Sequence, residues 1–496
     1  MKQWTGTGAG ALTAFFLCST ALHADVTAQE VWQGMADYYT DLGQSVQSAG
    51  QVMQGDTLVI TDAVISSETA EGKMSATVPE IRLRELGDGR VEVTMSDEIP
   101  VQVLTKPKTG EVVDMRMTIG QSDMAMIVSG DVTNTVYDFR SARMTISIDG
   151  MDVDDADVPL TLNAALFGNT ATYRMITGTT REIASQFASE KVDFEVAATD
   201  PEGKGNFSAT GSMTGLSGIS TASLPDGVDM SDLNAALLAG LSAEGSFTYD
   251  SGGYVMDFTD KGDSMSAQST GAGGSLHFDM SKSGLSYGGE GKRADVSMQY
   301  SQFPVPLDFS VEQTAFNFQM PVTQSNDPQP FGLVLKLVDL SVSDALWGMF
   351  DPAAQLPRDP ATLIVDLSGA AKMLVNIFDP NMAETVGQQP PGELNKLDIN
   401  EIEVSVAGAE LTGTGAMTFD NALGVPKPIG AIDLQLIGGN GLIDKLVAMG
   451  FVPEEQAMGA RMMMGLFSTV TGEDTLSSKI EFKQDGSIHA NGQRIQ

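Results

Sequence analysis

The chain of 496 residues carries 28 Lys and Arg against 65 Asp and Glu, which gives a formal net charge of −37. Such an acidic surface repels phosphate backbones and therefore excludes nucleic acid as a partner. The single cysteine, Cys18, excludes a disulfide framework and thiolate metal sites, and the length exceeds what one compact core usually holds.

The first 24 residues have the pattern of a secretory signal. Lys2 gives a basic start, residues 9–18 are small and apolar, and Ala24 precedes the acidic Asp25. The apolar stretch is too short to cross a bilayer, which takes about 20 residues. We therefore expect a signal peptide over residues 1–24, cleavage after Ala24, and a periplasmic protein that folds without cysteine.

The first element expected after the signal is an amphipathic helix over residues 28–46. Thr27 and Glu30 form a capping box, and Val26 and Val31 are placed as its hydrophobic staple. Its apolar side chains fall on one stripe, made of Val31, Met35, Tyr38 and Leu42.

Most of the remaining chain alternates apolar and polar residues with a period of two. Val192, Phe194 and Val196 alternate with Asp193 and Glu195. The same alternation occurs at residues 115–119, 144–148, 276–280, 307–311, 316–320, 402–406 and 432–436. Because successive side chains of a strand point to opposite faces, each segment has one apolar and one wet face. That pattern is typical of antiparallel sheet.

A few short helices are expected between the strands. One follows Ser231, one follows Ser343 and ends at Asp351-Pro352, and a pair covers 442–449, ending at Gly450, and a stretch from Pro453 through the methionines at 462–464. Two stretches rich in Gly and Ser, at 264–275 and 286–291, are expected to be loops.

These elements predict a mainly β protein with a large antiparallel sheet, curved or split, and a few short capping α-helices. Well over ten strands are more than an open twisted sheet holds without curling or splitting. The sheet is therefore expected either to form a trough or to divide into a two-lobed sandwich. The polar stretch 321–330 is the expected boundary between an N-terminal lobe, 25–325, and a C-terminal lobe, 326–496.

Residues suited to catalysis or metal binding are scarce. After the signal the only histidines are His277 and His489, both at polar positions of predicted strands, and a Ser-His-Asp triad would need one of them. The acidic run 149–157 lacks the glycine and the closing glutamate of a calcium loop. We predict no catalytic, cofactor-binding or metal-binding residue and no enzyme, although carboxylate-based glycoside hydrolysis stays an alternative.

Three stretches of the chain carry a family resemblance. They are residues 24–46 (ADVTAQEVWQGMADYYTDLGQSV), residues 350–369 with Phe350-Asp351-Pro352 and Asp366-Leu367-Ser368-Gly369, and residues 472–494 with Gly472-Glu473-Asp474-Thr475-Leu476. These stretches resemble an exported bacterial family known as domain of unknown function 2125. The resemblance extends over nearly all of the chain after the signal and implies no activity or site residues. The chain is also distantly similar in architecture to large envelope proteins whose long curved sheets hold lipid.

The expected function is a non-catalytic one in the periplasmic envelope. One-sided strands with few helices leave apolar faces that something must cover. The leading hypothesis is a lipid or another apolar ligand held on the concave side of a curved sheet. The alternative is a structural scaffold whose partner is another envelope protein. Neither needs a cofactor, nucleic acid or integral insertion in the membrane.

Overall fold

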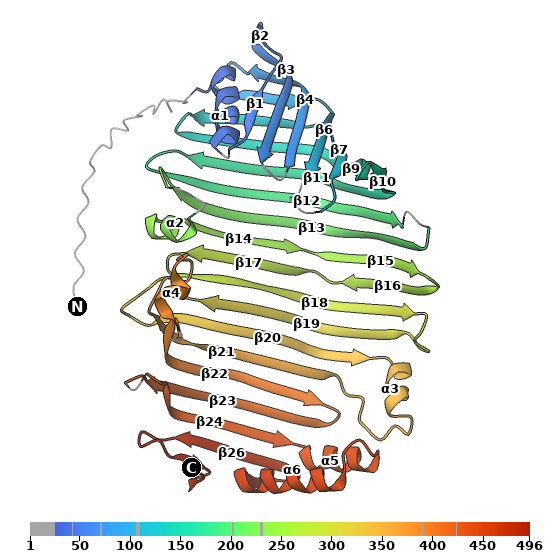
Figure 1. Ribbon diagram of the computed structural model, residues 1–496, viewed down its shortest axis with the longest axis vertical. Coiled ribbons are helices and arrows are strands. Elements are labelled where there is room, and N and C mark those ends of the chain that lie inside the picture. Colours follow the sequence, from blue (N-terminus) through green and yellow to red (C-terminus); the bar gives the residue numbers. More distant parts are fainter. Residues whose placement is uncertain are drawn as a thin grey trace, which may run out of the picture.

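A computed structural model describes residues 25–41, 43–69, 72–105, 110–200, 203–228, 232–387, 390–422 and 424–496. The predicted signal, 1–24, lies outside the described residues. Within them are six helices and 28 strands, and all the strands belong to one sheet with antiparallel pairing. The predicted fold class is confirmed, and a single curved sheet is what the chain forms (Figure 1).

The N-terminal part of the sheet branches and rejoins. β3 pairs with β1, β2 and β4, β4 pairs with β5 and β6, and β7 and β8 both pair with β9. The elements are α1 (Ala28–Asp41), β1 (Ser45–Gln47), β2 (Gly50–Gln54), β3 (Thr57–Thr69), β4 (Gly72–Glu85), β5 (Val91–Met95), β6 (Glu98–Thr105), β7 (Val113–Ser122) and β8 (Ala125–Asp131).

The middle of the sheet is a ladder of long strands, each paired with the next. At two places, two shorter strands take the position of one long strand. β14 and β15 both pair with β13, and β16 and β17 both pair with β18. The elements are β9 (Asn134–Val153), β10 (Ala156–Asp157), β11 (Leu160–Ile176), β12 (Thr180–Thr199), β13 (Gly205–Pro225), α2 (Leu233–Ala239), β14 (Ser242–Tyr249), β15 (Ser251–Asp260), β16 (Asp263–Gly271), β17 (Gly274–Ser281), β18 (Gly284–Tyr300) and β19 (Leu307–Met320).

The C-terminal part continues the same ladder and ends in a helix pair. The elements are β20 (Gln329–Val342), α3 (Asp344–Phe350), β21 (Ala361–Met373), α4 (Met382–Val386), β22 (Gly392–Val406), β23 (Ala409–Asp420), β24 (Lys427–Ile437), α5 (Gly439–Ala448), α6 (Glu454–Phe467), β25 (Thr469–Gly472), β26 (Thr475–Phe482), β27 (Ile488–Ala490) and β28 (Gln493–Arg494). β19 pairs directly with β20, so the sheet is continuous across 321–328, where the sequence predicts a lobe boundary. The division into lobes stays a prediction.

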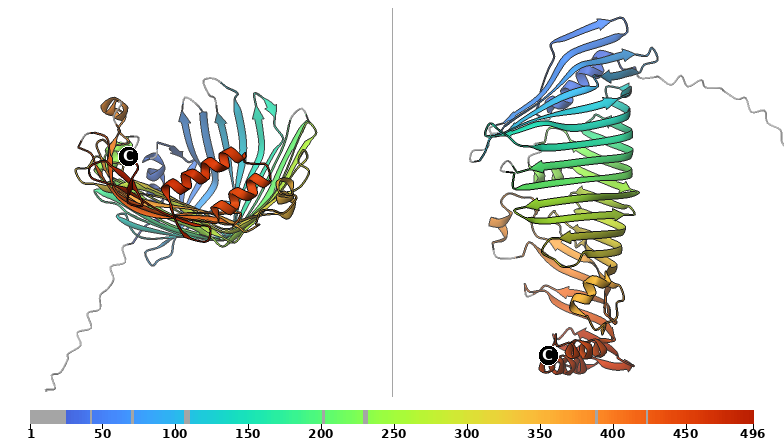
Figure 2. Two further views of the ribbon diagram at one scale, coloured as in Figure 1. Left: turned by 90° about the horizontal axis from the view of Figure 1, so that it is seen from below. Right: turned by 90° about the vertical axis from the view of Figure 1, so that its right-hand side faces the viewer.

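The sheet is long in the direction in which its strands stack and is curved along the strands. Seen from the C-terminal end, the sheet has a U-shaped section (Figure 2). α1 lies inside the U at the N-terminal end of the sheet, and the pair α5–α6 lies inside it at the C-terminal end. The other helices lie along the margins (Figure 1). The molecule is therefore a trough with a helix at each end.

The helix ends follow local sequence closely at α1. Thr27 N donates to Glu30 Oε2 at 2.9 Å and Glu30 N donates to Thr27 Oγ1 at 3.2 Å, so the predicted capping box is confirmed. The helix is shorter than the predicted 28–46, because it ends at Asp41 and β1 begins at Ser45. At α2 the capping side chain is that of Asp232. Ser231, after which the sequence predicts this helix, lies outside the described residues.

The prediction of loops at 264–275 and 286–291 is wrong, because these residues form most of β16 and part of β18. Gly273 has a φ of 96° at the turn between β16 and β17, whereas Gly288 and Gly289 within β18 allow close side-chain packing. A Cβ on Gly289 would lie 2.6 Å from Cδ2 of Leu276, and one on Gly288 would lie 2.5 Å from the ring of His277. The neighbouring strand's side chain occupies the space of the missing one.

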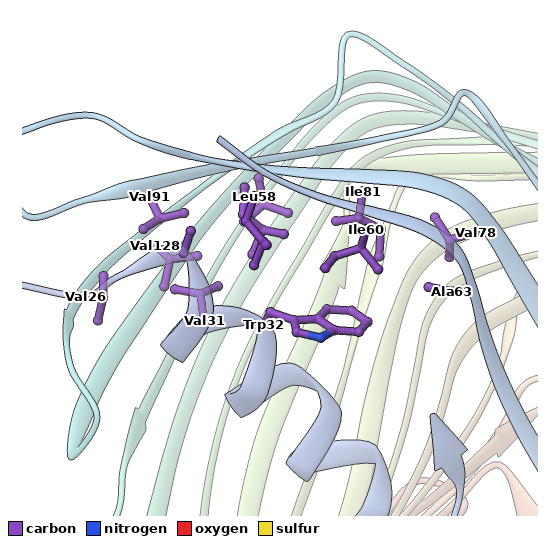
Figure 3. Packing of buried hydrophobic residues seen from close by; sticks show 13 residues of the cluster. Val26, Val31, Trp32, Leu58, Ile60, Ala63, Val78, Ile81, Val91 and Val128 are labelled. Atoms are coloured by element: carbon purple, nitrogen blue, oxygen red, sulfur yellow. The ribbon is translucent and has the colours of Figure 1, made fainter. Parts of the chain in front are cut away.

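The largest fully packed core lies under α1. Trp32 and Val31 of the helix face Ile60 and Leu58 of β3 and Ile81 of β4 (Figure 3). A smaller cluster forms where Ala236 and Leu237 of α2 pack against Val322 at one margin.

Candidate functional site

One face of the sheet carries helices at both ends and is here called the inner face. Near the N-terminal end, Tyr137 of β9 and Tyr173 of β11 line a cavity together with Met35 of α1. Near the C-terminal end, Leu434 of β24 and Ile480 of β26 line a cavity together with Phe467 of α6. The residues between these two ends can be followed strand by strand.

Directly opposed residues of antiparallel strands lie on the same face, so the pairing register traces rows across the sheet. The row that passes through Leu434 is called inner row 1. It consists of Met126, Phe139, Ala171, Phe187, Gly218, Phe247, Leu276, Gly289, Phe316, Leu335, Val365, Ile402, Gly413 and Leu434. Every one of these members is apolar or glycine, and the residue that pairs with Leu434 on β26, Ser478, is polar.

A second row runs beside the first on the same face, two residues away along each strand except at one bulge between Ile399 and Ile402. It is called inner row 2 and consists of Val128, Tyr137, Tyr173, Ser185, Ser220, Gly245, Phe278, Tyr287, Phe318, Leu333, Leu367, Ile399, Gly415, Ile432, Ile480 and Ala490. No charged residue stands in either row of the described chain.

The rows are long compared with a single ligand. Inner row 1 crosses fourteen strands, and thirteen steps of about 4.8 Å give a length of roughly 60 Å. One leaflet of a bilayer core is about 15 Å thick. The rows therefore span several acyl chains placed end to end.

Large side chains of these rows stay exposed in the middle of the trough. Phe187 is 42% exposed, Phe278 is 43% exposed and Phe318 is 44% exposed. Phe187, Phe247, Phe278 and Tyr287 line a depression of ≈380 Å³. Leaving such area in water costs about 25 cal/mol per Å². An apolar ligand that covered these rings would recover part of that free energy.

Glycines in the rows shape this surface. A Cβ on Gly218 would lie 2.3 Å from Cε1 of Phe187, and a Cβ on Gly245 would lie 2.6 Å from Cε1 of Phe278. Each ring therefore packs over the glycine of the next strand. Rings in this orientation leave a flatter apolar surface than rings that project away from the sheet.

The opposite face, here called the outer face, is mostly polar, although Ile219 of β13 is exposed on it. At its C-terminal part four carboxylates, those of Asp366, Glu401, Glu403 and Asp433, line a groove of ≈850 Å³. Asn400 Nδ2 donates to Asp366 Oδ1 at 2.8 Å, and Lys336 lies 3.7 Å from Glu401. Asp366 and Glu401 are thus held by neighbouring residues of the sheet.

The two histidines lie on strands, as the sequence predicts. His277 is exposed on β17. His489 Nε2 lies 3.1 Å from Ser487 Oγ, and that hydroxyl donates to Asp485 Oδ1 at 2.6 Å. In a catalytic triad the carboxylate would bind the imidazole, whereas here it binds the serine and His489 Nδ1 lies 3.4 Å from the carbonyl of Gly492.

The acidic run 149–157 is used by the sheet itself. Thr118 Oγ1 donates to Asp149 at 2.6 Å, Arg116 pairs with Asp152 at 2.7 Å, and the backbone of Val112 donates to Asp154 at 2.8 Å. In the part of the chain that the structure describes, no group of three or more His, Cys, Asp or Glu is placed to hold a metal ion.

Comparison with known proteins supports the family resemblance. The model of a family described as an uncharacterized protein conserved in bacteria (DUF2125) matches residues 251–490, and this part of the chain is similar to that family. Of the three resembling stretches, residues 350–369 fall within the match, residues 472–494 fall within it as far as residue 490, and residues 24–46 lie outside it. No curated protein and no solved structure matches the chain.

Two acidic residues in the resembling stretches have structural roles. The backbone N–H groups of Gln355 and Leu356 donate to Asp351, at 2.9 and 2.8 Å. Asp474 accepts from the backbone of Asn440 and Gly441 at the start of α5. Burial raises the pKa of Asp474, but these two N–H groups bring that pKa below its usual value.

Among the helices of the described residues, none combines the length and the apolar content that crossing a bilayer takes.

Proposed function

We propose that this protein is a non-catalytic protein of the bacterial periplasm that binds lipids or similar apolar ligands along inner rows 1 and 2. The observation that carries the proposal is a largely apolar and uncharged floor, exposed in its middle, between α1 and α6, in which Ser185 and Ser220 are polar members of inner row 2. Lipid would cover the floor and recover the free energy that its exposure costs.

The length of the rows favours several acyl chains over one. A pocket for a single small ligand usually has a volume of about 300–1,000 Å³ and encloses it on most sides. A floor of roughly 60 Å is a path rather than a pocket. The proposal is accordingly for a carrier that holds lipids in a line, with their polar groups toward the open side of the trough.

The scaffold alternative has its own support at the two edges of the sheet. Val52 of β2 is 56% exposed and Val470 of β25 is 73% exposed, and both belong to edge strands. Unpaired strand edges invite pairing with another chain. A protein partner would then bind at an end of the trough and not along its floor.

The test is native mass spectrometry of protein released gently from its own periplasm. Wild type is compared with a variant carrying Phe316→Glu and Phe318→Glu on the inner face of β19. The matched control carries Asn317→Glu and Gln319→Glu, the outer-face neighbours in the same strand, with the same change of charge.

We expect lipid adducts on wild type and on the control, and a loss of most adducts on the inner-face variant, because carboxylates on the floor must be desolvated when acyl chains bind. Ligand-free wild type, or equal adducts on all three proteins, would contradict the proposal. Amino-terminal sequencing of the same sample tests export, for which the expected first residue is Asp25.

A further inference from the structure

Inner rows 1 and 2 occupy only one half of the sheet. They pass through β14 and β17, whereas β15 and β16 lie beside these two strands in the other half (Figure 1). Because the sheet is curved along its strands, the two halves are the two arms of the U (Figure 2). The arm that contains β15 and β16 is here called the second arm.

A third row on the inner face crosses the second arm. Ile99 of β6 packs against the core cluster under α1, as Met126 of inner row 1 and Tyr137 of inner row 2 do, so all three lie on the inner face. The pairing register continues from Ile99 as far as β20. This row is called inner row 3 and consists of Ile99, Ile119, Ile146, Ala164, Phe194, Gly211, Tyr254, Ser269, Val296, Phe309 and Val342. None of these residues is charged.

Inner rows 1 and 3 are seven residues apart on the strands that they share. On β19 the two members are Phe316 and Phe309, and on β12 they are Phe187 and Phe194. In a regular strand an odd spacing places two side chains on opposite faces. Because both rows begin at the core under α1, the alternation must shift between them.

The shift occurs at a line of irregular residues in the middle of the long strands, here called the crease. Gly168 of β11, Gly215 of β13 and Asp339 of β20 have left-handed φ values of 61°, 63° and 54°. A left-handed residue interrupts the pleat and bends the strand. On β12 the buried Ser189 lies at the crease, and its hydroxyl is 3.1 Å from each of two backbone carbonyls. The crease therefore lets both arms turn their apolar side chains inward.

The second arm has the same alternation of faces as the first. Two residues beyond inner row 3 lies inner row 4, which consists of Leu162, Val196, Ala209, Met256, Ala267, Met298 and Leu307. The outer-face residues between these two rows are Asn163, Glu195, Thr210, Val255, Gln268, Ser297 and Asp308. Of these only Val255 is apolar, so the apolar side of the second arm is its inner side.

Large side chains of inner row 3 are exposed, as those of inner row 1 are. Ile146 is 37% exposed, Tyr254 is 42% exposed and Phe309 is 36% exposed. Keeping apolar area in water costs about 25 cal/mol per Å². An occupant that covered inner row 3 would recover part of that free energy.

The occupant that fits this surface is apolar and uncharged. A second copy of the chain would carry the same formal net charge of −37 and would be repelled. An acyl chain has no charge, and the two arms face one another across the U (Figure 2). A chain that lies in the trough therefore has apolar side chains available on both arms.

We propose that inner rows 3 and 4 bind acyl chains of membrane phospholipid and form a second wall of the same trough. Lipid is then held between two apolar arms that meet at the crease, and not on one floor alone. This inference rests on the proposed lipid-binding function and names a second set of residues for it.

The test measures contact between acyl chains and single positions of the purified mature protein. The mature chain has no cysteine, because Cys18 is the only one and lies in the predicted signal. One cysteine is therefore introduced at a time and labelled with bimane, a fluorophore that bromine quenches at short range. The quencher is phosphatidylcholine with brominated acyl chains, and the same lipid without bromine is the reference.

Each position of inner row 3 has a control next to it in the same strand. The inner positions are Phe194→Cys, Tyr254→Cys and Phe309→Cys, and the outer-face controls are Glu195→Cys, Val255→Cys and Ser310→Cys. Val255 is itself apolar and 49% exposed, so it separates the face of the sheet from apolar character. Phe316→Cys of inner row 1 reports binding to the first arm. Urea unfolding of every labelled variant checks its fold.

We expect the loss of fluorescence at the three inner positions to match that at Phe316→Cys, and the loss at the three controls to be several-fold smaller. A second measurement needs no substitution. Wild type irradiated with a phosphatidylcholine that carries a diazirine in its acyl chain should be labelled at Tyr254 and Phe309, as mapped by mass spectrometry of peptides.

Quenching at Phe316→Cys alone, with no diazirine label on the second arm, would overturn this inference and leave the proposed function in place. Stronger quenching at the controls than at their inner neighbours would overturn it as well, because the alternation would then not shift at the crease. Absence of quenching at every position, Phe316→Cys included, would overturn both this inference and the proposed function.

Discussion

Asp351 shows how a single carboxylate can organise a loop. It is fully buried after α3 and accepts two backbone N–H groups, from Gln355 and Leu356. The hydrogen bond from Gln355, followed by that from Leu356, holds the pKa of Asp351 below its usual value against the opposing effect of burial. The charged form is therefore favoured by the folded state.

Replacing Asp351 by Asn should lower the free energy of unfolding at neutral pH. In acid this difference between variant and wild type should disappear. A carboxyl whose pKa is depressed on folding contributes stability above its unfolded pKa of about 3.9, and that contribution is lost as pH falls through the lower folded value. Urea unfolding of wild type and variant from pH 7 down to pH 3 measures the gap. Asp359→Asn, an exposed neighbour, is the control, and a gap that stays constant in acid would show that the charge is not responsible.

Gly218 should resist substitution because of the ring that covers it. In Gly218→Leu the new side chain would need the space of Phe187, and overpacking of this kind costs about 1–3 kcal/mol. Equilibrium unfolding in urea measures the loss. Gly178→Leu, at a turn where the nearest atom lies 3.6 Å from the added Cβ, should be nearly neutral. Similar losses at both glycines would contradict the proposed packing.

At this scale the sequence predicts what depends on near neighbours. The capping box of Thr27 and Glu30 is read from a spacing of three residues and is confirmed. The sequence does not predict the strand positions of Gly288 and Gly289, because the side chains that take up the space next to them, His277 and Leu276, belong to another strand. The cavity between α1 and Tyr173 has no sequence signal, since it depends on how the helix and the sheet lie relative to each other.

Among the elements, α1 has the densest contacts with the sheet. Trp32 is 6% exposed and belongs to the cluster that contains Ile60, Ile81 and Leu83 (Figure 3). The helix thereby lies inside the N-terminal end of the trough and forms one wall of the cavity that Tyr137 and Tyr173 line.

Trp32→Ala should loosen this end and leave the rest of the ladder intact. Removing a large buried aromatic costs about 3–5 kcal/mol. Because each strand contacts mainly its neighbours, as in repeat proteins, the loss should stay local. Hydrogen exchange should quicken in α1, β3 and β4 but not in β18 to β22, with Gln33→Ala on the exposed side of α1 as control. Uniformly faster exchange would contradict the local picture.

The faces of the strands are the part of the fold that period-two alternation predicts well. Phe316, Phe318 and Met320 of β19 fall on one side, as their spacing indicates. What covers that side does not follow from the spacing, because the alternation is the same whether a second sheet or a ligand lies opposite. The sequence therefore does not distinguish a trough from a sandwich, whereas the strand pairing does.

For the whole molecule, the continuous pairing from β3 to β26 makes one body with two different ends. The N-terminal end has α1 and a cavity lined by Tyr137 and Tyr173, and the C-terminal end has α6 over Leu434 and Ile480. The acidic groove of Asp366 and Glu401 lies on the other face of the sheet. The proposed binding surface and this acidic groove thus lie on opposite sides of the sheet.

The central claim is that lipid lies along the inner face, and crosslinking inside the cell tests it most directly. A photoreactive phenylalanine analogue is placed at Phe187, Phe316 or Ile402 of inner row 1. The controls are the outer-face neighbours Gln186, Asn317 and Glu403. After irradiation of living cells, lipid adducts are counted by mass spectrometry. The account predicts adducts at all three inner positions, far apart along the trough, and almost none at the outer ones. Adducts absent from the inner positions, or equal on both faces, would contradict it.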